Sequence, residues 1–185
     1  MKVKEFLWHS LVLILFFILV GNYSGFNLNF GSDDGTQFHN TKNLFVFNEL
    51  SPASLMPQLL YALLFNFLDY NKWIYIPLLT NFLFLVSSYT FIYLIANYLF
   101  HRKIAIISSF IFLFTSSINA QYLLRWTPYL MASSLSLAGI YYFIKLQKIK
   151  SRKEILVYSF LTSLFTASAL LSRRIWQIML FILVF

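Results

Sequence analysis

The chain has 185 residues, of which 59% are hydrophobic and 11% charged, and its formal net charge is +8. Soluble domains are closer to half apolar and a quarter charged, and the apolar residues here form long blocks, which excludes an ordinary soluble domain. The absence of cysteine excludes disulfides and thiolate chemistry. The basic residues flank apolar blocks, which is typical of topology control in a membrane and not of nucleic-acid binding.

The first element is an apolar run at residues 6–20, preceded by Lys2 and Lys4. A basic start followed by an apolar run also fits a signal peptide. No A-x-A-like cleavage site follows the run, because the next residues read GNYS. We therefore favour a retained first membrane span, with a cleaved signal as the alternative.

Residues 21–51 form the most polar stretch of the chain, rich in Gly and Asn, and are expected to be a loop. The apolar run that follows, at residues 59–68, is too short to span a bilayer by itself. It is interpreted as an amphipathic helix in the membrane interface, entered at Pro57. Residues 21–72 are thus predicted to be an external loop with an interfacial helix.

Four further apolar runs predict spans that begin at Trp73, Ile104, Thr127 and Ile155. Residues 73–100 exceed the hydrocarbon thickness, and Trp73 and Tyr75 suit an interfacial start. Another apolar run starts at Ile175. The predicted fold is all-α and polytopic, one transmembrane domain over residues 1–185 with about five spans plus the start of a sixth. We expect the chain to be the N-terminal part of a larger enzyme, inactive by itself.

The distribution of basic residues favours a cytoplasmic N-terminus in a cell membrane. Nine basic residues would then be cytoplasmic, namely Lys2, Lys4, Arg102, Lys103, Lys145, Lys148, Lys150, Arg152 and Lys153. Five would be outside, namely Lys42, Lys72, Arg125, Arg173 and Arg174. If residues 56–68 also formed a span, the orientation of every later loop would be reversed. The basic loop at 145–153 would then face the outside, against the positive-inside rule. The acidic loop is therefore predicted to be external.

Asp33 and Asp34 stand together in this loop. The sequence Ser-Asp-Asp-Gly is typical of turns, so a solvated turn is one interpretation. The other is a general base at the membrane surface, which takes the proton of an acceptor hydroxyl. Together with the pair, His39 and Glu49 could form a site for a divalent cation, but their spacing is not specific, and no cofactor is predicted. His9 and His101 flank spans and are interpreted as interfacial residues.

Arg125, Arg173 and Arg174 lie at the predicted external ends of spans, against the positive-inside pattern. Arginine matches phosphate oxygens through its planar guanidinium, which makes these residues candidate phosphate ligands. The alternative is that they extend toward lipid headgroups without any further role.

The order of these parts resembles a known family. An acidic pair, Asp33-Asp34, follows the first span, and a proline-marked segment with Pro52 and Pro57 leads to the next one. Three later joints complete the pattern, His101-Arg102-Lys103, QYLLR at 121–125 and LLSR at 170–173. This order resembles the N-terminal part of GT-C membrane glycosyltransferases of the protein mannosyltransferase and aminoarabinose transferase type.

The resemblance implies an enzyme that moves a sugar from a polyprenyl-phosphate donor to a protein, lipid or glycan acceptor on the non-cytoplasmic face. It implies that Asp33 and Asp34 supply the base, and that Arg173, with Arg125 or Arg174, holds the donor phosphate. The chain departs from the family, since its pair is Asp-Asp and not Asp-Glu, and its prolines are separated. The rival interpretations are a non-catalytic multi-pass subunit and a transporter or flippase fragment.

Overall fold

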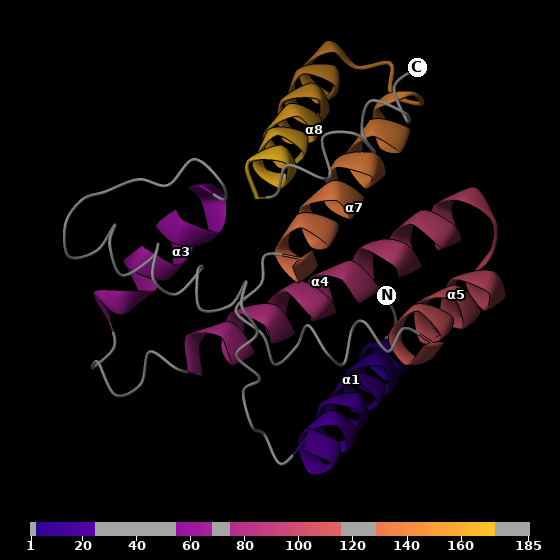
Figure 1. The fold of residues 1–185 in the computed structure, drawn as a ribbon. Helices are drawn as coiled ribbons and strands as arrows, with labels where there is room; N and C mark the ends of the chain where they lie inside the picture. Colours follow the sequence, from indigo (N-terminus) through magenta and orange to yellow (C-terminus); the bar gives the residue numbers. More distant parts are fainter. Residues whose placement is uncertain (1–2, 25–54, 68–74, 116–128, 173–185) are drawn as a thin grey trace.

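The computed structural model describes residues 3–24, 55–67, 75–115 and 129–172, and within them it contains helices and no strand. The predicted all-α class is confirmed for this part of the chain. Its six helices are α1 (Val3–Ser24), α3 (Leu55–Phe65), α4 (Ile76–Leu99), α5 (Arg102–Thr115), α7 (Tyr129–Leu146) and α8 (Arg152–Ser172) (Figure 1).

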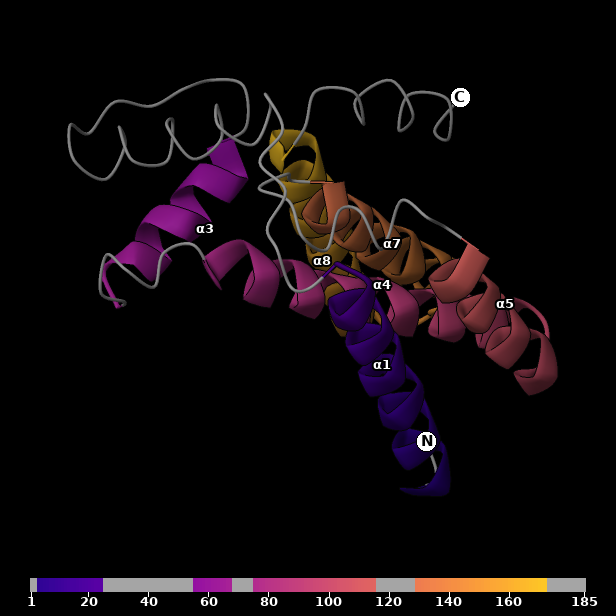
Figure 2. The ribbon, with the colours of Figure 1, turned by 60° about the horizontal axis from the view of Figure 1, so that its bottom comes forward.

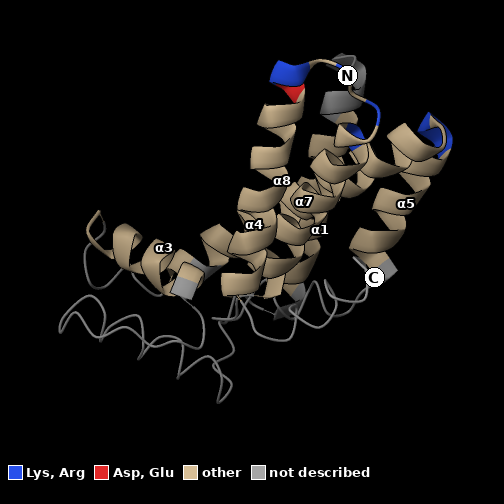
Figure 3. Ribbon diagram, turned by 90° about the horizontal axis from the view of Figure 1, so that it is seen from above, with Lys and Arg blue, Asp and Glu red and all other residues tan. Residues whose placement is uncertain are grey.

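Five of these helices alternate in direction across one bundle. α1, α5 and α8 begin at one end, and α4 and α7 return to it (Figures 2 and 3). We call this the basic end, because it carries the described Lys and Arg residues of the α4–α5 and α7–α8 joints (Figure 3). The opposite end, where α1, α5 and α8 finish, is called the far end.

Three helices are long and apolar enough to cross a membrane, by length and composition, among the residues that the structure describes. They are Leu78–Leu99 within α4, Tyr129–Leu146 and Arg152–Ser172. The prediction of five spans is therefore supported for three. The described apolar stretch of α1, Trp8–Val20, is shorter, and α5 has 14 residues, about 21 Å, where about 20 residues are needed.

The observed helix boundaries differ slightly from the predicted ones. α4 begins at Ile76 with a proline in its first turn, where the missing N–H of proline costs no helical hydrogen bond. α5 begins at Arg102, two residues before the predicted start. The prediction started at the first apolar residue, whereas the helix also includes Arg102 and Lys103. His101 precedes it, and the His101 Nδ1 accepts a long hydrogen bond of 3.4 Å from the Ile104 N–H.

The polarity of the bundle is reversed relative to a soluble protein. Its outer surface exposes large apolar side chains such as Ile14, Leu19, Phe110, Leu156 and Phe160. Its interior buries polar ones, namely His9, Gln58, Thr80, Asn81, Ser88, Ser109, Ser134, Ser136, Ser168 and Ser172. An apolar exterior this extensive marks a surface that is covered by lipid or protein, and small or polar residues between helices are typical of membrane bundles.

Among the described helices, α7 and α8 make the most extensive contact. A Cβ added to Gly139 of α7 would lie 2.8 Å from Oγ1 of Thr166 and 3.5 Å from the Thr166 backbone nitrogen. A methyl group at this position would therefore displace the Thr166 hydroxyl, and a larger side chain would also meet the backbone of α8. α7 also packs against α4, and α4 packs against α5.

Bulky side chains attach α1 to the bundle. Phe16 meets Phe114 of α5 edge-on, with ring centroids 5.5 Å apart, and Phe17 meets Phe82 of α4 at 4.9 Å. Leu85 and Leu113 are fully buried in the same cluster. Aromatic rings in edge-on contact add about 0.5–1.5 kcal/mol each beyond their burial, so α1 is fixed by dispersion and ring geometry.

The predicted interfacial segment contains a helix, α3, with 11 residues. Pro57 lies in its first turn and is buried, and Tyr61 and Phe65 pack against Ile76 at the start of α4. α3 lies beside the far end of the bundle (Figure 2). Its position at a membrane interface and the external loop around it stay predictions.

Replacing Gly139 by Leu is expected to lower the free energy of unfolding by about 1–3 kcal/mol, because the new side chain forces α7 and α8 apart. Thermal unfolding of the purified chain in detergent, followed by circular dichroism, measures the change. Phe143→Leu on the exposed side of the same helix is the matched control. Gly139→Ala should cost less when Thr166 is also Ala, and an equal cost in both backgrounds would contradict this packing.

Candidate functional site

The five residues predicted to carry chemistry, Asp33, Asp34, Arg125, Arg173 and Arg174, lie outside the described residues. The same holds for His39 and Glu49. The structure therefore gives neither their side-chain positions nor their distances from one another. It does give the helix ends to which their segments are joined.

Those helix ends lie together at the far end of the bundle. α1 finishes there at Ser24, before the segment with the acidic pair, and α5 finishes there at Thr115, before the segment with Arg125 (Figures 2 and 3). α7 starts there at Tyr129, and α8 finishes there at Ser172, directly before Arg173 in the sequence. All five predicted residues thus belong to segments that leave the described helices at the same end.

A buried polar cluster between α1, α4 and α5 is a feature that the sequence analysis missed. His9, interpreted from the sequence as interfacial, is only 7% exposed, and its Nδ1 lies 2.5 Å from the Tyr89 hydroxyl. The Tyr93 ring lies edge-on to the imidazole, with centroids 4.8 Å apart. Which of His9 and Tyr89 donates the hydrogen bond depends on the imidazole tautomer.

Ser109 joins this cluster from α5. Its hydroxyl donates within α5, to the Ala105 carbonyl at 2.9 Å and the Ile106 carbonyl at 3.0 Å. An ionisable side chain inside a bundle of apolar helices is a functional candidate by default. Two features of the sequence could have indicated this cluster. One is a lone histidine within an apolar helix, and the other is a pair of tyrosines four residues apart on one face of another helix.

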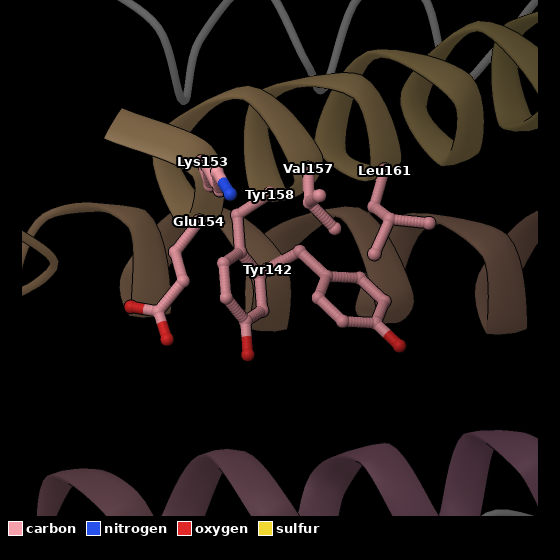
Figure 4. Close-up of a pocket in the computed structure, with 6 residues that line it drawn as sticks. All are labelled: Tyr142, Lys153, Glu154, Val157, Tyr158 and Leu161. Atoms are coloured by element: carbon pink, nitrogen blue, oxygen red, sulfur yellow. The ribbon is translucent and has the colours of Figure 1, made fainter. Parts of the chain in front are cut away.

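A second site is a pocket of about 420 Å³ at the basic end, between α7 and α8 on the side that faces α4 (Figure 4). Polar, aromatic and aliphatic side chains line it, namely Tyr142, Lys153, Glu154, Val157, Tyr158 and Leu161. Figure 4 shows the hydroxyls of Tyr142 and Tyr158 and the Glu154 carboxylate pointing to the same side. Such a pocket suits a ligand that has both a polar and an apolar part.

No protein-family model, curated protein or solved structure matched this chain. Within the part of the chain that the structure describes, no three His, Cys, Asp or Glu residues are grouped as a metal site. The residues that the sequence analysis considered for a divalent cation lie elsewhere in the chain. The function is therefore inferred from the arrangement of the helices and from the chemistry of the segments joined to them.

The His9–Tyr89 hydrogen bond is expected to stabilise the fold by about 0.5–1.5 kcal/mol, because both groups are buried among apolar helices. A double-mutant cycle with His9→Phe and Tyr89→Phe measures this coupling through thermal unfolding in detergent. Tyr75→Phe, at an exposed tyrosine that precedes α4, is the control and should be neutral. A coupling energy near zero would contradict the assigned hydrogen bond.

Proposed function

We propose that the protein is a membrane glycosyltransferase that moves a sugar from a polyprenyl-phosphate donor to an acceptor on the non-cytoplasmic face. The observation that carries this proposal is the gathering of helix ends at the far end of the bundle. The segments with a candidate base and candidate phosphate ligands all start there. A transferase of this kind needs both groups at one side of the membrane.

The apolar exterior supports a location in the bilayer. Exposed Leu, Ile and Phe side chains cover α1, α5 and α8, and burying such surface in lipid removes it from water. The donor's lipid tail would share that environment. Its sugar and phosphate would then lie at the membrane surface, within reach of a loop that starts from a helix end.

The basic end supports the orientation. Residues 145–153 contain Lys145, Lys148, Lys150, Arg152 and Lys153, and the α4–α5 joint adds Arg102 and Lys103. The start of α1 lies at the same end (Figure 3). The positive-inside rule favours the cytoplasm for this end, so the far end would face outward.

The proposed chemistry is a displacement at the anomeric carbon of the donor sugar. Asp33, with Asp34 beside it, takes the proton of the acceptor hydroxyl as its oxygen bonds to that carbon. The bond from the carbon to the phosphate oxygen breaks, and the electron pair leaves with the phosphate. Arg173, with Arg125 or Arg174, would stabilise the negative charge that develops there, since fixed donors aimed at developing charge lower the barrier.

The buried His9–Tyr89 pair favours a second candidate, a transporter that moves a proton. Transporters place polar groups inside their spans, and a histidine hydrogen-bonded to a tyrosine can pass a proton. The two functions depend on different residues, so substitutions distinguish them. Loss of transport in His9→Phe with transfer intact would favour the transporter.

The variant with both Asp33→Asn and Asp34→Asn is expected to lower the transfer rate by about 10²–10⁴-fold, because it removes the base without changing size. The assay offers polyprenyl-phosphate sugars to membranes that contain the full protein and follows labelled sugar in the acceptor fraction. Glu49→Gln, which removes another carboxylate from the same loop, is the control. Unchanged transfer by the double variant at normal protein levels would refute the proposal.

Single cysteines test the orientation, and the background is clean because the chain has none of its own. A cysteine at Thr36 is expected to react with a membrane-impermeant maleimide added to intact cells, and one at the exposed Gln147 only after the membrane is opened. Labelling is read by gel shift. The reverse pattern would place the acidic pair in the cytoplasm and rule out the transferase as drawn.

A further inference from the structure

The pocket between α7 and α8 changes from polar to apolar along the direction of α8. Lys153 and Glu154 line it in the first turn of the helix, Tyr158 follows, and Leu161 lies farthest along the helix (Figure 4). Leu161 follows Lys153 by eight positions, which is about 12 Å along the helix axis. Because α8 is long and apolar enough to cross a membrane, this direction leads from the surface toward the hydrocarbon.

Aromatic rings hold lysine ammonium groups beside this pocket. The Lys145 Nζ lies 5.2 Å from the centroid of the Tyr141 ring and 6.0 Å from that of Tyr158, which lines the pocket. The Lys148 Nζ lies 4.6 Å from the centroid of Tyr98 on α4. Cation–π contacts of this kind keep flexible lysine side chains in place, which reduces the entropy lost when an anion binds.

The local charge is strongly positive. Residues 145–154 carry five basic side chains and one acidic side chain, Glu154, for a formal charge of +4. Glu154 lies in the first turn of α8, where a carboxylate interacts favourably with the positive end of the helix dipole. The start of α8 thus stabilises the carboxylate of Glu154, and the basic side chains around it can attract an anion.

We propose that this pocket binds the headgroup of an anionic phospholipid. Lys145 and Lys153 attract the lipid phosphate, the Tyr142 and Tyr158 hydroxyls donate hydrogen bonds to its oxygens, and an acyl chain lies over Val157 and Leu161. A soluble anion would use the cations but not the aliphatic end of the pocket, and charge complementarity selects anionic over zwitterionic lipid. The site does not depend on glycosyl transfer and lies at the opposite end of the bundle.

Native mass spectrometry of the full chain in detergent, with equal amounts of phosphatidylglycerol and phosphatidylcholine, tests the site. The unmodified chain should retain phosphatidylglycerol preferentially. Lys145→Gln with Lys153→Gln should lower that retention by roughly tenfold, since each basic residue near the lipid adds to the attraction. Arg102→Gln with Lys103→Gln, which removes two charges from the same end outside the pocket, is the matched control and should retain the preference.

Two milder variants keep the test informative if the double lysine variant folds poorly. Tyr158→Phe preserves the ring and should weaken retention, and Glu154→Gln should strengthen it by removing the repulsive carboxylate. Equal losses in the two charge variants would overturn the proposal in favour of general surface attraction. Displacement of the lipid by millimolar inorganic phosphate would overturn it as well. In a parallel experiment with phosphatidylethanolamine, a preference for that lipid that Glu154→Gln abolishes would also overturn it.

Discussion

The close approach of α7 and α8 at Gly139 and Thr166 is the contact on which the bundle depends. Lipid is as apolar as leucine, so helices in a membrane gain little by burying apolar surface against one another and associate through dispersion and hydrogen bonds. Both need short distances, which only small residues allow. α7 carries this contact and also packs on α4, and α4 in turn supports α5 and α1.

α1 joins the bundle in a different way. Its phenylalanines keep it further from α4 than small residues would, and the hydrogen bond between His9 and Tyr89 adds a directional contact. Aromatic side chains tolerate small displacements better than a glycine contact does. The α7–α8 pair thus makes the more extensive contact, and the position of α1 is set by one polar interaction and a set of rings.

The helical class and the alternating direction were predictable, because long apolar blocks and basic joints follow from the needs of the bilayer. The His9–Tyr89 contact joins residues 80 positions apart, and no local pattern encodes which helices meet. The α7–α8 pocket was missed for the same reason, since Lys145 and Tyr158 belong to different helices. The site roles stay sequence predictions for the five residues Asp33, Asp34, Arg125, Arg173 and Arg174. The structure describes only the helix ends that adjoin their segments.

The two ends of the bundle are too far apart to communicate through charge. The hydrocarbon between them is about 30 Å thick, and in the water on either side a charge is screened within about 8 Å. Lipid bound beside Lys145 would therefore influence the far end only by moving α7 and α8. Because Gly139 and Thr166 hold these helices in contact, they would move together, and the starts and ends of the two helices would shift as a unit. Tyr129 and Ser172, which adjoin the segments with Arg125 and Arg173, are the far ends of that same pair.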